Sequence, residues 1–258
     1  MQDLRITILQ ADQVWQDKNA NYSMYEAFFE QINETDLILL PEMFHTGFSM
    51  ETDELAEEWE SSQGMEFLLK WSRKLNAAIY TSLIIRENGK FYNRGVFVGP
   101  NQNVDFYNKR KLFGLGRENE FYSPGEKEII VDYQGWKMNL QICYDLRFPE
   151  LIRNRISTDG NPAYDILLYV ANWPARRIMH WEKLLAARAI ENQCYVIGAN
   201  RVGEDGNNLE YTGSSMVVNA LGEVCASNNS SKEGIISFNL NYEDLKSTRQ
   251  NLPFLRDF

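Results

Sequence analysis

The sequence has 258 residues, with 36 acidic and 26 basic side chains, so its formal net charge is −10 at neutral pH. Hydrophobic residues make up 44% and charged residues 24%, which is typical of a folded globular chain and excludes a disordered or fibrous one. The acidic excess also argues against nonspecific nucleic-acid binding, which needs Lys and Arg to neutralise phosphates.

Histidine and cysteine are scarce, with 2 His and 3 Cys in the chain. This supply argues against a metal centre rich in either residue, and any imidazole base has to be His45 or His180. Cys143, Cys194 and Cys225 are odd in number and form no CxxC motif, which indicates free thiols in a reducing compartment. No secretory signal begins the chain, and no apolar run reaches the roughly 18–20 residues that cross a bilayer. We therefore expect a soluble cytoplasmic protein.

Strand-like runs recur along the whole chain, each rich in Val, Ile, Leu or aromatic residues and bounded by Gly, Asn, Asp or Pro. The runs span 4–10, 36–41, 77–85, 91–98, 138–143, 165–171, 195–199, 215–219 and 234–240. Asn88-Gly89 between two of them predicts a tight antiparallel hairpin, and Leu221-Gly222 indicates another.

Three helical stripes lie between the strand-like runs. Tyr25, Phe28, Phe29 and Ile32 fall on one helical face, with Asn21 as the candidate N-cap. The other stripes are Phe67, Leu68, Trp71 and Leu75, and Trp181, Leu184, Leu185 and Arg188 in a stretch that ends near residue 192. Helices mixed with hairpins predict an α/β fold with mixed sheets, and the absence of a repeat or linker favours one domain.

Polar residues follow three of the apolar runs. Glu42 follows one in LILLPEMFHTGF, Lys109 lies between aromatics in FYNKRKLF, and Cys143 ends a strand in LQICYDLRFPE, where Pro149 is fit to open a helix. Ligands of α/β sheets gather beyond the carboxyl ends of strands, so Glu42 and Cys143 are candidates for one site. Taken singly, each residue also fits an ordinary role as a buried thiol, a loop acid or a surface charge.

Together the three strings resemble the signature segments of the nitrilase, or carbon–nitrogen hydrolase, superfamily. The matching segments are Pro41-Glu42-Met43-Phe44, Tyr107-Asn108-Lys109-Arg110-Lys111-Leu112-Phe113 and Cys143-Tyr144-Asp145-Leu146-Arg147-Phe148-Pro149. Their order and separations match as well, although Lys111 stands where many members have His. The strings MFHTGFSM, YVANWPARRIMHWEKLLAARAIENQCYVIGANRVG and YTGSS are most similar to the omega-amidase branch.

The resemblance implies a single-domain α-β-β-α sandwich over residues 1–258 that pairs with a second copy into a homodimer. Residues 241–258 would form a tail or helix that packs on the dimer. The family chemistry implies no metal and no cofactor, and it implies a small amide as the binding partner, with no nucleic acid and no membrane.

The resemblance assigns catalysis to Glu42, Lys109 and Cys143. Cys143 would be the nucleophile, Glu42 the general base and acid, and Lys109 the cation beside the oxyanion, joined by the backbone N–H of Tyr144. A second glutamate often precedes a Pro-Gly turn in the family, and spacing from that turn favours Glu118 over Glu120.

An omega-amidase releases ammonia from the terminal amide of a 2-oxo dicarboxylic acid monoamide such as 2-oxoglutaramate. The free carboxylate of such a substrate needs a cation or several N–H donors in the pocket. The candidate substrate-binding residues are Phe44, His45, Tyr144, Arg147, Trp173, Arg176 and Arg177. Each aromatic also fits the core, and Arg147 also fits a structural ion pair. Cys194 and Cys225 are expected to be packing residues.

Three alternatives remain open from the sequence. The same triad serves other amides and N-carbamoyl compounds in the superfamily. A Cys–His hydrolase would need His45 or His180, but neither neighbourhood looks like a papain-type signature. A non-catalytic binding protein on this fold is the remaining class, and the presence of all three triad residue types argues against it.

Overall fold

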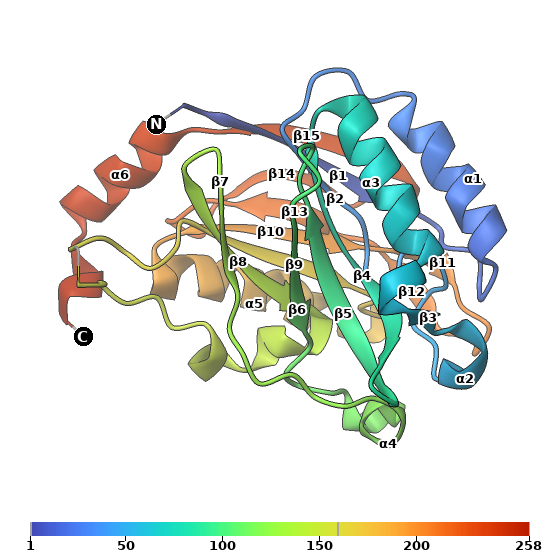
Figure 1. Ribbon diagram of the computed structural model, residues 1–258. Helices are drawn as coiled ribbons and strands as arrows, with labels where there is room; N and C mark the ends of the chain where they lie inside the picture. Colours follow the sequence, from blue (N-terminus) through green and yellow to red (C-terminus); the bar gives the residue numbers. More distant parts are fainter. Residues whose placement is uncertain (1, 159, 258) are drawn as a thin grey trace.

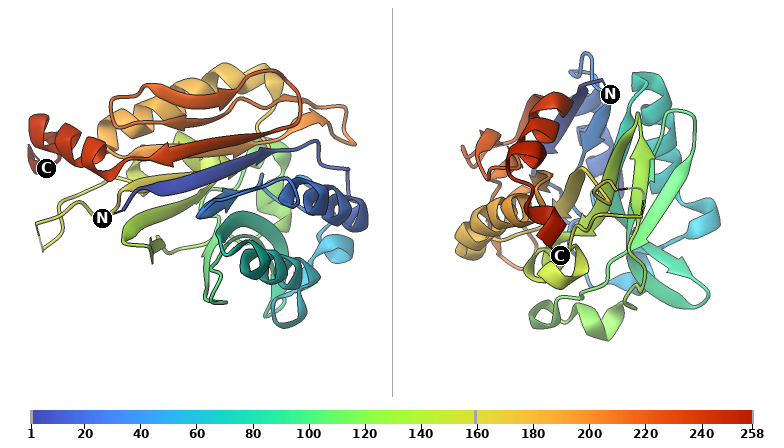
Figure 2. Two further views of the ribbon diagram at one scale, coloured as in Figure 1. Left: turned by 90° about the horizontal axis from the view of Figure 1, so that it is seen from above. Right: turned by 90° about the vertical axis from the view of Figure 1, so that its left-hand side faces the viewer.

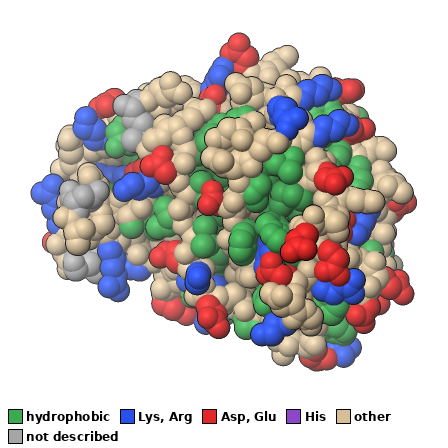
Figure 3. All heavy atoms as spheres, in the orientation of Figure 1, with side chains coloured by type: hydrophobic (Ala, Val, Ile, Leu, Met, Phe, Trp, Pro, Cys, Tyr) green, Lys and Arg blue, Asp and Glu red, His purple; other side chains and the backbone are tan. Residues whose placement is uncertain are grey.

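The computed structural model describes residues 2–158 and 160–257, and these form a four-layered α-β-β-α sandwich (Figure 1). Two sheets face each other, and helices cover their outer faces, as the view from above makes plain (Figure 2). The predicted fold class is confirmed. On the face drawn in Figure 3, acidic and basic side chains are interspersed around a central apolar area, so the net charge is not gathered there.

The first sheet has the order β15-β1-β2-β4-β5-β6, with β3 paired to one end of β4. Its strands are β15 (Gly234–Leu240), β1 (Leu4–Gln10), β2 (Leu37–Leu39), β4 (Ala78–Glu87), β5 (Lys90–Val98), β6 (Val104–Asn108) and β3 (Glu57–Glu58). β1, β2 and β4 are parallel, and β5 is antiparallel to both β4 and β6. β2 and β6 therefore run in the same direction.

The second sheet has the order β14-β13-β10-β9-β8-β7. Its strands are β14 (Val224–Asn228), β13 (Ser215–Val218), β10 (Tyr195–Asn200), β9 (Ile166–Ala171), β8 (Trp136–Ile142) and β7 (Ile130–Tyr133). The three central strands β8, β9 and β10 are parallel. A separate hairpin pairs β11 (Val202–Glu204) with β12 (Glu210–Thr212).

Long helices cover the outer faces of the sheets. α1 (Lys18–Phe29) and α3 (Gln63–Leu75) pack on the first sheet, and α5 (Ile178–Asn192) packs on the second. The shorter α-helices are α2 (Thr52–Leu55), α4 (Glu118–Phe121) and α6 (Tyr242–Asn251). The 3₁₀ helices are η1 (Trp59–Ser61), η2 (Gly114–Gly116), η3 (Cys143–Arg147), η4 (Pro149–Leu151), η5 (Ala175–Arg177) and η6 (Phe254–Asp257). Within the described residues, no helix is long and apolar enough to span a membrane.

Apolar side chains fill all three interfaces between the layers. Tyr80 and Ile142 lie between the two sheets, and Trp71 fills the space under α1 and α3. Trp181 fills the space beneath α5. A Cβ added to Gly198 would lie 2.6 Å from the Trp181 ring. Glycine at that position of β10 therefore lets α5 pack closely on the sheet. Fully burying side chains of this size stabilises the fold by about 1.5–3 kcal/mol each.

The hairpin predictions are confirmed, and the helix N-cap prediction is wrong. Asn88 and Gly89 adopt the left-handed φ values of 50° and 71° that a tight turn between β4 and β5 requires. α1 begins after Asp17, whose carboxylate accepts the N–H of Ala20 at 2.9 Å. Asn21 lies within the helix and is buried. Its side-chain amide donates to the carbonyl oxygen of Val14 and to that of His45 in the loop beyond β2.

The C-terminal helix α6 is fixed to its own chain. Leu245 is buried in the core between the sheets. Arg249 Nη1 donates to Asp165 Oδ1 at 2.6 Å, and Arg249 Nε donates to the carbonyl oxygen of Gln193 at 2.8 Å. α6 therefore covers the amino-terminal end of β9, which Asp165 precedes. The packing of 241–258 on a dimer stays a prediction, and residue 258 lies outside the described residues.

Candidate active site

Glu42 lies beyond the carboxyl end of β2, at the start of a tight turn. Met43 has a left-handed φ of 47°, which a residue with a side chain adopts only at some cost in energy. The turn is held from both sides, because Ser82 Oγ accepts the N–H of Met43 at 2.9 Å and Gln13 Nε2 donates to the Glu42 carbonyl oxygen at 3.1 Å. The Glu42 carboxylate is thus fixed on a rigid element.

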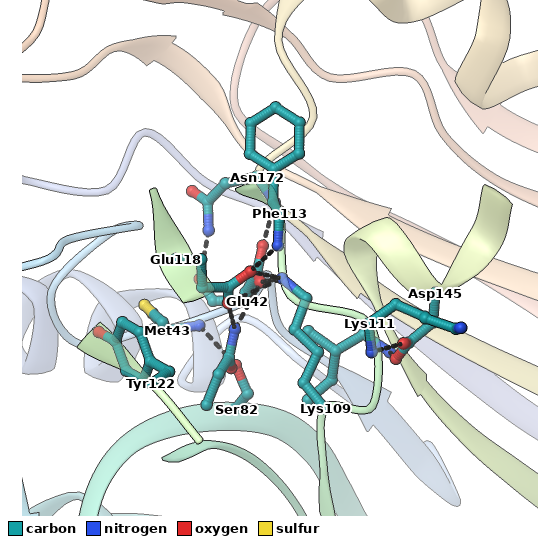
Figure 4. Close-up of polar contacts among 12 residues, drawn as sticks. Glu42, Met43, Ser82, Lys109, Lys111, Phe113, Glu118, Tyr122, Asp145 and Asn172 are labelled. Atoms are coloured by element: carbon teal, nitrogen blue, oxygen red, sulfur yellow. Dashed lines mark hydrogen bonds and ion pairs between the residues drawn. The ribbon is translucent and has the colours of Figure 1, made fainter. Parts of the chain in front are cut away.

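Lys109 follows β6 directly and meets two carboxylates (Figure 4). Its Nζ lies 2.9 Å from Glu42 Oε1 and 2.9 Å from Glu118 Oε2, and all three side chains are fully buried. Because β2 and β6 run in the same direction, their carboxyl ends bring Glu42 and Lys109 to one edge of the sheet. Glu118 opens the short helix α4 at the same place.

Neutral donors complete the binding of both carboxylates. Asn93 Nδ2 donates to Glu42 Oε1 at 2.7 Å and to Glu118 Oε1 at 3.0 Å. The N–H of Asn172, one residue beyond β9, donates to Glu42 Oε2 at 2.9 Å, and the N–H of Phe113 donates to Glu118 Oε2 at 2.6 Å. Asn172 directly follows a strand of the second sheet, so the Glu42 carboxylate connects the ends of the two sheets.

The charges in this cluster fix which groups are ionised. Burial disfavours the charge of Lys109, but Glu118 and Glu42 outweigh it and raise the Lys109 pKa well above its usual range. The ammonium therefore stays charged. Burial raises the pKa of Glu118, which Lys109 opposes and Glu42 increases further. One ammonium lies between two buried carboxyl groups, and the closeness of Glu42 is why it adds to the rise in the Glu118 pKa.

Cys143 directly follows β8 and begins η3 with a left-handed φ of 44°. Burial, followed by the charge of Glu42, raises the pKa of its thiol well above the usual range, although Lys109 acts in the opposite direction. The resting group is the neutral thiol. A thiol in this state becomes a strong nucleophile only when a neighbouring base removes its proton as it reacts.

Cys143 opens into a cavity of about 530 Å³. Its wall has an apolar and aromatic part, a basic part with four arginines, and two acidic residues, Glu51 and Asp205. The apolar and aromatic lining includes Trp15, Phe48, Met50, Phe113, Leu115, Tyr144, Trp173, Leu209 and Tyr211. The basic lining is Arg117, Arg147, Arg176 and Arg177. Among the residues that the structure describes, no carboxylate lies within ion-pair distance of Arg147, Arg176 or Arg177. The cavity therefore suits a small anionic molecule.

The carbon–nitrogen hydrolase family matches residues 5–250 of this sequence. The chain belongs to the carbon–nitrogen hydrolase family. It is 40% identical to a Yersinia enterocolitica protein named omega-amidase YafV, over 100% of this chain and 97% of the relative. It is 32% identical to the 2-oxoglutaramate amidase of Bacillus subtilis, over 98% of this chain and 96% of that one. The family resemblance seen in the sequence is confirmed.

A solved structure agrees with this family assignment. A Xanthomonas campestris CN-hydrolase superfamily protein, described with an arsenic adduct in its active site, is 37% identical and superimposes with a TM-score of 0.97. The match covers 100% of this chain and 98% of that one. The four-layered fold of this carbon–nitrogen hydrolase is thus that of the nitrilase superfamily.

The structure brings most of the predicted site residues together and separates two. Tyr144, Arg147, Trp173, Arg176 and Arg177 all line the cavity beside Cys143. Arg147 lies over the Trp173 ring at 4.7 Å and within 3.2 Å of the exposed His180, in place of an ion pair.

Phe44 and His45 do not line the cavity, so their placement there is a wrong prediction. Both are fully buried behind the Glu42 turn, since Phe44 packs among the apolar residues under α1 and α3. The ring of His45 lies 3.6 Å from Glu57.

Glu120 pairs with Arg117 on the surface, and Glu118 is the buried glutamate. Cys194 is fully buried, and Cys225 is half-buried against the core between the sheets.

Sequence reasoning missed Asn93 and Asn172, which hold the Glu42 carboxylate. Asn172 follows β9 directly, so the same rule that selected Glu42 and Cys143 would have selected it. Asn93 lies in the middle of β5, where a polar residue in a strand normally indicates a solvent-facing side chain. Only the arrangement of β5 beside β6 places it between two carboxylates.

His45 is expected to make the fold sensitive to acid. Burial lowers its pKa to about 4 in the folded chain, although Glu57 acts in the opposite direction. The unfolded chain takes up this proton near pH 6.5 and the folded chain only near pH 4, so stability falls as the pH drops between these values. His45 alone should lower the free energy of unfolding by about 2 kcal/mol at pH 5 relative to pH 7.5, while Asp145 and Glu118, whose pKa values are raised by burial, act in the opposite direction.

Urea unfolding of the unmodified chain and of His45→Gln at both pH values measures this effect. On going from pH 7.5 to pH 5, the free energy of unfolding of the variant should fall by about 2 kcal/mol less than that of the unmodified chain. His180→Gln, which changes the exposed imidazole, should keep it. An equal pH dependence in the unmodified chain and in His45→Gln would contradict the assignment.

Proposed function

We propose that this chain is an omega-amidase, which releases ammonia from the terminal amide of a small 2-oxo dicarboxylic acid monoamide such as 2-oxoglutaramate. The observation that carries the proposal is the buried Glu42–Lys109–Glu118 cluster, whose charges act on the Cys143 thiol. Cys143 in turn lines a cavity whose Arg147, Arg176 and Arg177 have no carboxylate partner among the described residues. The 40% identity to omega-amidase YafV over the whole chain supports it.

In the proposed reaction, Cys143 Sγ attacks the amide carbon while Glu42 takes the thiol proton. The raised thiol pKa makes this transfer necessary, since little thiolate exists beforehand. Glu42 then returns the proton to the amide nitrogen as the C–N bond breaks, which releases ammonia and leaves a thioester. Water attacks the thioester carbon and gives a proton to Glu42. The C–S bond then breaks, the thiol recovers its proton, and the carboxylate product leaves.

Lys109 stabilises the charge that forms on the carbonyl oxygen in both halves of the reaction. Its ammonium stays protonated, so it supplies a fixed positive charge in a buried setting. The N–H of Tyr144, the residue after the nucleophile, supplies the second donor. One such donor is typically worth about 3 kcal/mol of barrier. Glu118 acts through Lys109, which it holds in position at 2.9 Å.

Arg177 is the group best placed to bind the free carboxylate of the substrate. Its guanidinium lies 5.2 Å from the centre of the Phe113 ring and has no carboxylate partner among the described residues. Burial, followed by the neighbouring charge of Arg176, lowers the pKa of Arg177. A bound substrate carboxylate would reduce the repulsion between these two positive charges. Binding at Arg177 would also set where the amide of the substrate lies relative to its carboxylate.

Arg177→Gln is expected to raise KM for 2-oxoglutaramate by about 10-fold to 100-fold, with kcat changed much less, because a charged hydrogen bond is worth about 1.5–3 kcal/mol. Initial rates of ammonia release over a range of substrate concentrations measure both constants. Arg176→Gln is the matched control, since Arg176 is exposed at the mouth of the cavity, and it should raise KM less. A larger effect at Arg176 would reassign the carboxylate site.

The function itself is tested with a panel of amides. The purified chain is incubated with 2-oxoglutaramate, with shorter and longer 2-oxo acid amides and with N-carbamoyl amino acids, and ammonia and the acid product are measured. The proposal expects the highest kcat/KM for a 2-oxo acid amide. Turnover restricted to the carbamoyl compounds would keep the triad and change the substrate. No turnover of any amide, and no acyl adduct on Cys143, would favour a binding protein.

We further propose that residues 1–258 are one domain that pairs into a homodimer in the cytoplasm. The three cysteines are free thiols, which suits a reducing compartment. The four-layered fold extends without a linker from β1 to α6, which supports a single folding unit. Light scattering gives the mass in solution, and a monomer across micromolar concentrations would contradict the dimer.

A further inference from the structure

Asp145 is a buried carboxylate with three hydrogen-bond donors and no catalytic assignment. It is 0% exposed and lies two residues after Cys143. Asp145 Oδ2 accepts the N–H of Ile142 at 3.1 Å and the hydroxyl of Tyr107 at 2.8 Å. Asp145 Oδ1 accepts the N–H of Lys111 at 2.9 Å, which Figure 4 draws. One side chain thus binds two segments that are far apart in the sequence.

The two segments are those that carry Cys143 and Lys109. Ile142 directly precedes Cys143, whose left-handed φ of 44° has to be held by its surroundings. Tyr107 and Lys111 flank Lys109 on both sides. We propose that Asp145 is a positioning residue that fixes the Cys143 turn against the Lys109 segment. The proposal rests on the proposed function in one respect, that Cys143 is the nucleophile.

The hydrogen bonds require an acceptor at both oxygens of residue 145. The two backbone groups can only donate. The Tyr107 hydroxyl is also committed to donating, because it accepts from Arg110 Nε at 3.2 Å and from Arg110 N at 3.3 Å. An amide in place of the carboxylate would turn one acceptor into a donor that faces another donor. Asparagine therefore cannot reproduce the arrangement, although its size and shape match.

The cost of burying this charge indicates that it is not there for stability alone. Burial raises the pKa of Asp145 to about 6, against the opposing charge of Lys109 and the three hydrogen bonds. Among the described residues no cation forms an ion pair with Asp145, and a buried carboxylate without such a partner is an expensive way to connect two segments. The geometry that it holds, with a thiol and an ammonium at fixed separation, is what an acyl-transfer site needs.

The test compares Asp145→Asn with the matched variant Asp165→Asn. Asp165 is also a buried carboxylate, and it accepts Lys137 N at 3.2 Å and Arg249 Nη1 at 2.6 Å. It precedes β9, however, and so lies at the opposite end of the strand from the site. Both variants are expected to lower Tm. Only Asp145→Asn should lower kcat, by about 10-fold to 100-fold, with KM within about twofold, because a small displacement of reacting groups is costly.

A second readout does not depend on the substrate. The rate at which iodoacetamide alkylates Cys143 is measured by intact mass from pH 6 to pH 10. Asp145→Asn should shift this pH–rate profile, whereas Asp165→Asn should leave it unchanged. If the unmodified chain hydrolyses no 2-oxo acid amide, the proposed function fails, and the alkylation profile still decides the role of Asp145.

Two results would overturn the inference. One is a folded Asp145→Asn protein whose kcat and alkylation profile both match those of Asp165→Asn. The second result comes from Tyr107→Phe, which is measured if Asp145→Asn does not fold. Tyr107→Phe then removes one of the three donors and keeps the carboxylate, and it should lower kcat by about threefold or more with KM unchanged, as expected for one hydrogen bond. An unchanged kcat in that variant would contradict the positioning role.

Discussion

Cys143→Ala is expected to lower kcat for 2-oxoglutaramate by about 10⁴-fold or more, because removal of a nucleophile removes the covalent route altogether. The fold should be retained, since Cys143 lies at the edge of the cavity and loses only one sulfur atom. Ammonia release at saturating substrate measures the loss. Intact mass after brief incubation should show an acyl adduct on the unmodified chain and none on the variant.

Cys225→Ala is the matched control for this prediction. Cys225 is half-buried on β14, whereas Cys143 begins η3 and lines the cavity. The substitution makes the same chemical change, so kcat should stay within about twofold. A Cys143→Ala protein that keeps the turnover of the unmodified chain would exclude the thioester route. Loss of activity in both variants alike would indicate general damage from removing thiols.

Lys109→Met is expected to abolish measurable turnover and to lower the free energy of unfolding by about 3–5 kcal/mol, because it leaves buried carboxylates without their cation. The ammonium is the only cation within ion-pair distance of Glu42 and Glu118 among the described residues. Methionine fills a similar volume, so the loss reports the charge rather than a cavity. Urea unfolding and ammonia release measure the two effects.

The double variant Lys109→Met/Glu118→Gln separates the two effects of the charge. Removing the Glu118 carboxylate takes away one of the two uncompensated charges, so stability should recover by about 1–3 kcal/mol. Activity should not recover, since the oxyanion still has no cation. If the second substitution gave no recovery of stability, the buried charges would not be the cause of the loss. Recovery of turnover would exclude Lys109 from the chemistry.

The three residues proposed for catalysis lie in local strings of the sequence, and the resemblance of these strings to the nitrilase superfamily selected them. Glu42 and Cys143 each follow an apolar strand, and Lys109 lies in a distinctive aromatic and basic string. The long helices were predictable as well, because a stripe such as Phe67 to Leu75 repeats with helical period and matches α3. Strong periodicity and strand ends are local features, so one sequence contains them.

Short strands at the edges of the sheets were not predicted. β7 begins with the exposed Ile130, and β6 places Phe106 at the surface, so neither has the clear alternation of a half-buried strand. These strands form because a neighbouring strand offers free hydrogen-bonding groups. The neighbouring strand comes from another part of the chain, and only the folded sheet brings the two strands together.

Helical period and strand ends in the sequence predicted a mixed α/β fold, because both are local features. The resemblance of the three strings to the nitrilase superfamily implied the four-layered sandwich and the three residues proposed for catalysis. The tertiary structure decided which neighbours serve those residues. It placed Asn93 and Asn172 on the Glu42 carboxylate, and it put His45 behind the Glu42 turn instead of in the cavity. It also joined the Cys143 and Lys109 segments through Asp145. The physical reason is that hydrogen bonds and charges act over a few ångströms in space, and only the packing of the two sheets brings these distant segments that close.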